Sequence, residues 1–274
     1  MQPFKCCCGR ILRSLVADFK CDFVSAIAHI QSLSLGYSNE PLFSGLSLDI
    51  HAGMMLAVVG ANGTGKSTFV KTVLGLHDPK IGTIHWPKGR PDEIGYLAQL
   101  SEFDRRFPIR VRDLAAMGAW KGFNPFSGLN AAARKKVDQA LDQAGVLDLA
   151  ERPLHTLSGG QLQRTLFARV IMQDAPLIIL DEPFAAVDQN TEQHLLKIID
   201  GWKKEKRAVL LVVHDLSAVL DHCSHALLLG NGAASFGKVS DVLSHDRLVA
   251  QGYMSASQAS WIFRKSTEQQ ATHV

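Results

Sequence analysis

The chain has 274 residues, of which 46% are hydrophobic, and this suffices for one large α/β domain with a full core. Its formal net charge of +3 at pH 7 is too small to indicate an extended nucleic-acid surface. No run approaches about 18 consecutive apolar residues and the start lacks the apolar region of a secretory signal, so we expect neither a membrane span nor secretion. The five cysteines do not make a disulfide framework, which favours a reducing, cytosolic compartment.

Residues 1–28 precede the first strand signal, and we predict an extension that the folded domain does not need. The alternative is a basic helix lying in a membrane interface, because apolar side chains at 11–19 share one helical face among lysines and arginines. The three adjacent cysteines at 6–8 cannot easily converge on one tetrahedral ion, and the histidines and cysteine at 222–225 also lack the spacing of a closed metal site. We therefore predict no structural metal in either segment.

Residues 29–99 are predicted to be rich in strands, with alternating apolar patterns at 30–35 and 46–50 and an apolar strand at 55–59. This strand leads directly into Gly-Ala-Asn-Gly-Thr-Gly-Lys-Ser-Thr, residues 60–68, which has the form of a P-loop. The alternative is a Gly-rich turn without a ligand. Because the motif requires an apolar strand before the loop and has one here, we favour phosphate binding.

The P-loop residues have separate expected roles. Gly60, Gly63 and Gly65 are expected to allow positive φ angles and a close approach of backbone N–H groups to phosphate. A helix that begins near Lys66 adds its positive dipole end, while the Lys66 ammonium reaches the β- and γ-phosphates and the Ser67 hydroxyl binds Mg²⁺. The predicted nucleotide-binding residues of the loop are Gly60, Asn62, Gly63, Gly65, Lys66, Ser67 and Thr68.

Residues 100–160 are predicted to be helical, and the clearest helix covers 131–149 with lysines 135 and 136 on its polar face. Its apolar positions recur at helical spacing and are Val137, Leu141, Ala144 and Leu147. The α/β pattern returns after about residue 161 and includes an apolar run at 208–213.

A further predicted strand ends in two carboxylates. Residues 177–180 form a short continuous apolar run, typical of a strand buried on both faces of a mostly parallel sheet. Asp181 follows at the carboxyl end, where open α/β sheets bind ligands, and is expected to hold Mg²⁺ through Ser67 or water. Glu182 would face the γ-phosphate and accept the proton of an attacking water.

Between the P-loop and these carboxylates lies Leu-Ser-Gly-Gly-Gln, residues 157–161, which resembles the signature of the ABC ATPases. The resemblance extends from about residue 29 to residue 243, with every motif in the family's order. It implies an α/β P-loop NTPase fold, an ABC-type ATPase core with an inserted helical signature subdomain. We accordingly predict an ATPase domain at 29–245, with the helical subdomain at about 100–165, and a tail at 246–274.

The resemblance also implies roles for single residues. Tyr37 matches the aromatic that stacks on adenine, and Gln99 matches the Q-loop glutamine that senses Mg²⁺ and the membrane partner. Asp188 matches the D-loop aspartate, and His214 matches the switch histidine that hydrogen-bonds the γ-phosphate. Taken alone, Tyr37 and His214 would be read as a core tyrosine and a strand-end histidine.

The signature implies a second copy of the chain, because in the family it completes the ATP site of another copy of the domain. The implied signature residues are Ser158, Gly159, Gly160 and Gln161. The implied catalytic residues are Glu182, His214 and Gln99, and the implied Mg²⁺ ligands are Ser67, Gln99 and Asp181. ATP and Mg²⁺ are the expected cofactors.

Residues 103–113 and Phe184 are similar to the ATPases of zinc, manganese and iron importers. This implies uptake of a metal ion through integral-membrane permease subunits, fed by an extracytoplasmic metal-binding protein, with the chain at the cytoplasmic face of the inner membrane. Phe107, Val111 and Met117 would then lie in the groove that receives a permease helix. The alternative is that these three side chains simply pack the helical subdomain.

The alternative function is a soluble ABC-type ATPase that acts on nucleic acid or ribosomes. Chromosome and repair ATPases of this type place long heptad segments between the P-loop and the signature, and translation-factor types carry two ATPase domains. This chain has neither sustained heptads nor a second P-loop, which favours the importer and argues against a nucleic-acid partner. Import rather than export is implied by the resemblance alone.

Overall fold

The structure is a computed structural model of the chain. It describes residues 26–36, 41–122, 129–185, 187–213, 216, 221–255 and 257. Residues 1–25 of the predicted extension, Tyr37, His214 and residues 258–274 of the predicted tail lie outside this described part.

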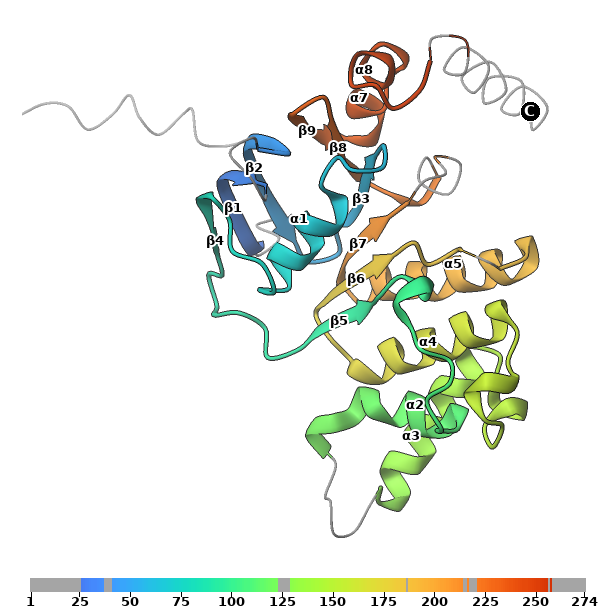
Figure 1. Ribbon diagram of the computed structural model, residues 1–274. Coiled ribbons are helices and arrows are strands. Elements are labelled where there is room, and N and C mark those ends of the chain that lie inside the picture. The colour runs from blue at the N-terminus through green and yellow to red at the C-terminus, as the bar shows by residue number, and fades with distance from the viewer. Residues whose placement is uncertain are drawn as a thin grey trace, which may run out of the picture.

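Two β-sheets make up the α/β architecture that the sequence predicts (Figure 1). The small sheet contains β1 (Ala26–Leu35), β2 (Phe43–His51) and β4 (Ile81–His85). The large sheet contains β3 (Met55–Gly60), β5 (Ile94–Leu97), β6 (Leu177–Asp181), β7 (Ala208–Val212), β8 (His225–Gly230) and β9 (Ala233–Lys238). The small sheet is antiparallel in the order β2-β1-β4. The large sheet has the order β5-β6-β7-β3-β8-β9 and is parallel except for β9.

The helices lie around the large sheet and in a separate group beside β5 (Figure 1). They are α1 (Lys66–Val73), α2 (Val111–Ala116), α3 (Ala131–Gln143), α4 (Gly159–Gln173), α5 (Gln189–Lys204), α7 (Val239–Val242) and α8 (His245–Ala250). Short 3₁₀ segments are Leu100–Glu102, Met117–Gly122, Leu147–Leu149 and Leu154–Thr156. The helices α2, α3 and α4 pack on one another. They form the helical region that the sequence predicts, and they lie between the P-loop and β6 along the chain.

The large sheet is buried on both faces, and alternate residues of each strand serve two cores. On β3, Met55 and Ala57 belong to the core shared with α4 and α5, whereas Leu56 and Val58 face the small sheet and α1. Every residue of β3, β6 and β7 is buried. A strand that is buried on both faces has a continuous run of apolar residues, which explains why these three strands could be predicted from the sequence.

The helix predicted at 131–149 ends earlier than expected. Helix α3 stops at Gln143, and Gly145 follows with a φ of 67°. The N–H of Val146 donates to the carbonyl of Leu141 at 2.9 Å, which is the closing bond of a Schellman motif. Leu147 therefore leaves the helical face and is 38% exposed, so its prediction as a core position is wrong. The other three apolar positions, Val137, Leu141 and Ala144, are buried as predicted.

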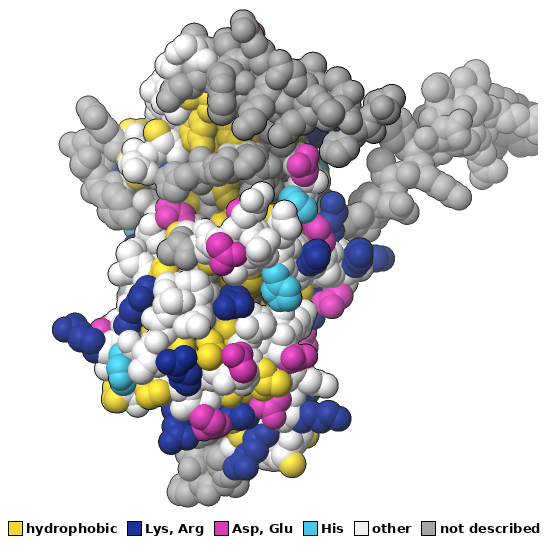
Figure 2. Space-filling model, turned by 90° about the vertical axis from the view of Figure 1, so that its right-hand side faces the viewer, with side chains coloured by type: hydrophobic (Ala, Val, Ile, Leu, Met, Phe, Trp, Pro, Cys, Tyr) yellow, Lys and Arg dark blue, Asp and Glu magenta, His cyan; other side chains and the backbone are white. Residues whose placement is uncertain are grey.

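An arginine network joins the helical group to the loop before the signature. Arg112 on α2 contacts Asp138 on α3 and donates to Glu151 at 2.8 Å, and Arg110 donates to the same Glu151 at 2.6 Å. These hydrogen bonds lower the pKa of the Glu151 carboxyl. Elsewhere on the described surface, basic and acidic side chains are interspersed over the face shown in Figure 2.

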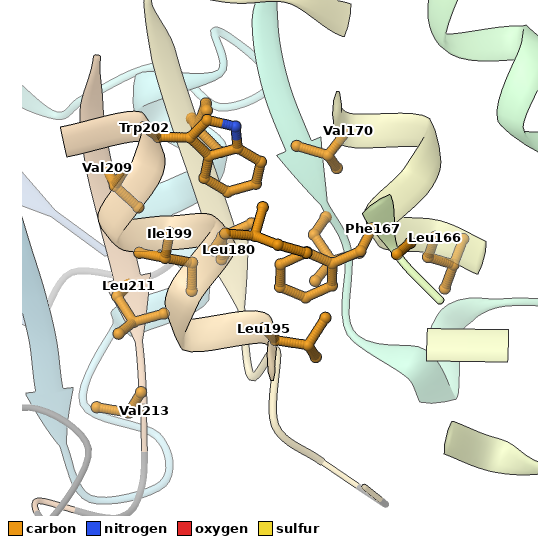
Figure 3. Close-up of a cluster of buried hydrophobic side chains, with 14 of the residues drawn as sticks. Leu166, Phe167, Val170, Leu180, Leu195, Ile199, Trp202, Val209, Leu211 and Val213 are labelled. Atoms are coloured by element: carbon orange, nitrogen blue, oxygen red, sulfur yellow. The ribbon is translucent and has the colours of Figure 1, made fainter. Parts of the chain in front are cut away.

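The core between α4, α5 and the large sheet depends on two aromatic rings (Figure 3). Phe167 on α4 and Trp202 on α5 stack with ring centroids 6.2 Å apart and planes 3° from parallel. Leu180 of β6 points into the same cluster from the sheet. Because α4 begins with the signature, this packing fixes the direction of the helix that carries it.

We expect Phe167→Ala to lower the free energy of unfolding by about 3–5 kcal/mol, because it removes a fully buried ring and leaves a cavity. Chemical denaturation would measure the loss. The matched control is Leu76→Ala, since Leu76 is 71% exposed and should change stability by less than about 0.5 kcal/mol. Equal effects of the two substitutions would contradict the proposed importance of this core.

Candidate functional site

A cavity of about 580 Å³ lies among the segments that follow β3, β5 and β6. Strand β7 pairs with both β3 and β6 in parallel, so the carboxyl ends of these strands share one edge of the sheet. The cavity is lined by Leu42, Asn62, Gly63, Gly65, Lys66, Ser67, Thr68, Gln99 and Glu182. Nearly all of these are residues that the sequence predicts for a nucleotide site; Leu42 is the addition.

The three predicted glycines of the loop have two different reasons to be glycine. Gly63 and Gly65 have φ angles of 82° and 103°, in the left-handed region that favours glycine. Gly60 does not have a positive φ, so that part of its prediction is wrong. A Cβ at Gly60 would lie 2.5 Å from the carbonyl oxygen of Leu229 on β8. Gly60 therefore allows the end of β3 to lie close against β8.

Lys66 is buried at the start of α1 and is held by its own loop. Its Nζ donates to the carbonyl oxygens of Gly60 at 2.7 Å and Ala61 at 3.0 Å. Burial lowers the pKa of this ammonium, and the carboxylates of Glu182 and Asp181 act in the opposite direction. The loop thus places a cation in the cavity where an anionic phosphate would stabilise its charge.

The two carboxylates have different settings. Asp181 ends β6 and is buried. Glu182 adopts a left-handed φ of 50°, and its N–H donates to the carbonyl of Val212 on β7 at 3.1 Å. The amide of Gln99 donates to the Glu182 carboxylate, with Nε2 and Oε2 2.7 Å apart. A non-glycine residue in this backbone region costs of order 1–3 kcal/mol and is typical of functional sites.

The signature residues form the first turn of α4. The Ser158 hydroxyl accepts from the N–H of Gln161 at 3.2 Å, and the Gln161 side chain accepts from the N–H of Ser158 at 3.0 Å, which is a capping box. Gly159 and Gly160 follow the cap at the helix start. None of these four residues lines the cavity around Lys66. Within a single chain, the signature and the P-loop therefore do not line the same cavity.

Polar side chains of α4, which the sequence analysis missed, connect it to segments that adjoin the cavity residues Glu182 and Gln99 in the chain. Buried Gln163 donates to the carbonyl of Pro183 at 2.8 Å, immediately after Glu182. Arg169 donates to the carbonyl of Tyr96 at 2.9 Å, and Gln173 accepts from the N–H of the same residue at 3.1 Å. Desolvation lowers the pKa of the Arg169 guanidinium. Polar residues within an apolar helix were the available signal, but their partners are distant in sequence.

Asp188 caps helix α5 and does not line the cavity. Its carboxylate accepts from the N–H and the hydroxyl of Thr191, both at 2.9 Å, and these hydrogen bonds lower its pKa. Its expected part in nucleotide binding, which the match to the D-loop implies, therefore stays a prediction. The same holds for Tyr37 and His214, which lie outside the described residues.

Two of the three residues predicted for the permease groove are exposed. Phe107 and Met117 are 54% and 44% exposed, as large apolar side chains awaiting a partner would be. Val111 is wholly buried in the helical group, so its assignment to the groove is wrong. It is the first residue of α2, and its N–H donates to the carbonyl of Arg152 at 3.0 Å, which turns it inward.

The segment at 222–225 has ordinary packing contacts. His222 pairs with Asp200, with Nδ1 and Oδ2 3.2 Å apart, and His225 stacks on Phe236. Cys223 is buried, which raises the pKa of its thiol to about 12.

Among the described residues, none of the helices combines the length and the hydrophobicity that a membrane span requires.

Comparisons with known proteins identify the family of the chain. The profile of the family described as ABC transporter matches residues 43–185. The zinc import ATP-binding protein ZnuC of Saccharophagus degradans is 33% identical, over 80% of this chain and 82% of that protein. The manganese transport system ATP-binding protein MntB of Bacillus subtilis is also 33% identical, over 80% and 89%. A solved structure described as an inward-facing ABC transporter of the metal-chelate type superposes with a TM-score of 0.75 at 30% identity, over 84% and 90%.

We expect Lys66→Ala to weaken binding of a non-hydrolysable ATP analogue by about 10-fold to 150-fold. It removes a buried cation whose charge-assisted hydrogen bonds contribute about 1.5–3 kcal/mol each. Equilibrium titration would measure the affinity, with Lys80→Ala as the control because Lys80 is exposed and away from the cavity lining. Unchanged affinity of Lys66→Ala would remove this residue from the binding site.

Proposed function

The chain belongs to the ABC transporter family, and from that premise we propose that it is the ATP-hydrolysing subunit of a membrane importer of metal ions. ATP hydrolysis is the characteristic activity of the family. We propose that two copies enclose ATP between them and couple its binding and hydrolysis to uptake of zinc, manganese or iron. We further propose that residues 29–245 form the ATPase domain and that residues 100–165 are its helical subdomain.

One observation carries the two-copy proposal: the cavity holds the P-loop and Glu182 but none of the four signature residues. The signature lies instead at the start of α4, where Ser158 is exposed. A helix N-terminus directs N–H groups and a positive dipole end toward an anion. We propose that Ser158, Gly159, Gly160 and Gln161 meet the γ-phosphate held by another copy, so that ATP joins the two.

The residues around the cavity can support phosphoryl transfer to water. We propose that Lys66 neutralises the β- and γ-phosphates while the loop N–H groups hold them, and that Glu182 accepts the proton of the attacking water. Gln99 orients the Glu182 carboxylate through the hydrogen bond between them. Tyr37 is proposed to stack on adenine and His214 to hydrogen-bond the γ-phosphate. Asp188 is proposed to bind the nucleotide as the D-loop aspartate.

The donor set also fits Mg²⁺. The Ser67 hydroxyl, the Gln99 amide oxygen and the Asp181 carboxylate are hard oxygen ligands of the kind this ion prefers, and Ser67 and Gln99 line the same cavity. When bound, Mg²⁺ would offset the negative charge that the phosphates carry. We propose these three residues as its ligands.

The proposed metal cargo is supported by relatives that are zinc and manganese transport proteins and by Phe184 with residues 103–113. The chain would work with integral-membrane permease subunits, and indirectly with an extracytoplasmic metal-binding protein. Phe107 and Met117 offer apolar surface to a permease helix. We therefore propose peripheral attachment to the cytoplasmic face of the inner membrane.

Glu182→Gln should lower steady-state ATP hydrolysis by about 100-fold or more, because the amide keeps the shape of the side chain but cannot accept a proton. Binding of ATP should stay within about 3-fold of wild type, since the cation and the loop are intact. Phosphate release and equilibrium titration measure the two quantities.

The control for this experiment is Glu205→Gln, the same chemical change at an exposed carboxylate paired with Arg207. It should leave hydrolysis unaltered. Turnover of Glu182→Gln within a few-fold of wild type would exclude Glu182 as the base.

A complementation experiment tests the two-copy site. Ser158→Arg blocks the signature and leaves Lys66 intact, whereas Lys66→Ala does the reverse. Each variant should hydrolyse poorly alone, and an equal mixture should recover at most about a quarter of wild-type activity, because half of the dimers are mixed and each has one intact site. Retained ATP binding by Ser158→Arg controls for folding, since the lost cap costs only about 1 kcal/mol.

Two results would contradict the shared site. Ser158→Arg alone could hydrolyse ATP normally. Alternatively, wild-type activity could rise linearly with protein concentration at high dilution while light scattering detects no ATP-dependent dimer of Glu182→Gln. Either result would mean that one chain carries a complete site.

A further inference from the structure

A row of polar side chains crosses the outer face of the small sheet. Asp49 on β2 pairs in register with His29 on β1, and His29 pairs on its other side with His85 on β4. The neighbours of His29 in its strand, Ala28 and Ile30, are buried. Because side chains alternate between the two faces of a strand, the row points away from the core, where all three residues have exposed surface.

The contacts within this row orient the ring of His29. Its Nδ1 lies 2.6 Å from Oδ1 of Asp49, and the two side chains are 34% and 48% exposed. The rings of His29 and His85 stack with centroids 6.2 Å apart and planes 11° from parallel. Since the carboxylate engages Nδ1, the other ring nitrogen of His29, Nε2, is the one available to a further ligand.

We propose that His29 and His85 together bind one divalent transition-metal ion of the zinc class. Imidazole nitrogen suits such ions, and directly opposed residues of an antiparallel pair have Cβ atoms about 5 Å apart, so both rings can reach a shared ion. Asp49 would be the carboxylate that holds a metal-binding histidine in the required tautomer and orientation.

The site would be open to solvent. Over the described residues, no group of three or more histidine, cysteine, aspartate or glutamate side chains is arranged to hold a metal. Water would therefore complete the coordination around the two histidines. The ring of His29 would keep its hydrogen bond to Asp49, and the exposed ring of His85 would turn out of the stack toward the ion, which disturbs none of the buried side chains beneath the sheet.

The same row has a structural explanation, in which the ion pair and the stacked rings only stabilise the sheet. The two explanations differ in what zinc does. A bound ion would link β1 to β4 and would stabilise the folded chain by mass action. If the row is purely structural, zinc does not bind there and does not change the stability of the chain. The proposal does not rest on the proposed function, since this row lies outside the cavity that contains Lys66.

The test is calorimetric titration of the full chain with Zn²⁺. Wild type should bind one ion more than His85→Asn or His29→Asn. Asp49→Asn should keep that ion but bind it about 10-fold to 100-fold more weakly, because the outer carboxylate is lost. Comparing stoichiometries removes any contribution of other histidines or of the cysteines, which all variants share.

The matched control is His245→Asn. His245 also lies beside a carboxylate, with Nδ1 3.0 Å from Oδ1 of Asp246, but it is not part of the row. This variant should bind as many ions as wild type, with the same affinity. Anomalous scattering at the zinc edge from a soaked wild-type crystal, which involves no substitution, should place an ion between His29 and His85. Equal stoichiometry and affinity in wild type and His85→Asn, or no anomalous peak at the pair, would overturn the proposal.

Discussion

The parallel pairing of β3, β7 and β6 is the constraint on which the candidate site depends. It fixes the register Val58–Val212–Asp181 across the three strands, so the P-loop and the carboxylates leave the sheet at the same edge. Lys66 and Glu182 are far apart in sequence, yet both line one cavity. A shift of β3 or β6 by one residue along β7 would turn every side chain of that strand toward the opposite core.

Helix α4 transmits this arrangement from the sheet to the signature. Its side chains reach the carbonyl after Glu182 through Gln163, and both backbone groups of Tyr96 through Arg169 and Gln173. Tyr96 lies on the edge strand β5, whose outer backbone groups would otherwise lack a strand partner. A rotation of α4 would strain these bonds together. The start of α4, the Glu182 turn and the strand leading to Gln99 are therefore mechanically linked.

Sequence patterns predicted the parts of the fold that depend on residues close together in the chain. Continuous apolar runs revealed β3, β6 and β7, and the loop after β3 could be assigned from its glycines and Lys66. The sequence did not predict contacts between residues that are far apart in the chain. The role of Gly60 depends on the position of Leu229 on β8, and the burial of Val111 depends on a hydrogen bond to Arg152. The three-residue row on the small sheet likewise requires a register that the sequence alone does not fix.

The cavity is preorganised at an energetic cost that nucleotide binding can offset. Lys66 is buried and donates to two carbonyls of its own loop, and burial lowers the pKa of its ammonium group although the nearby carboxylates act in the opposite direction. Glu182 is held in a left-handed conformation by a backbone bond to β7. An anionic phosphate beside Lys66 would stabilise the ammonium form and offset the free-energy cost of removing that charge from water. The desolvation of Lys66 therefore favours an anionic ligand beside its ammonium group.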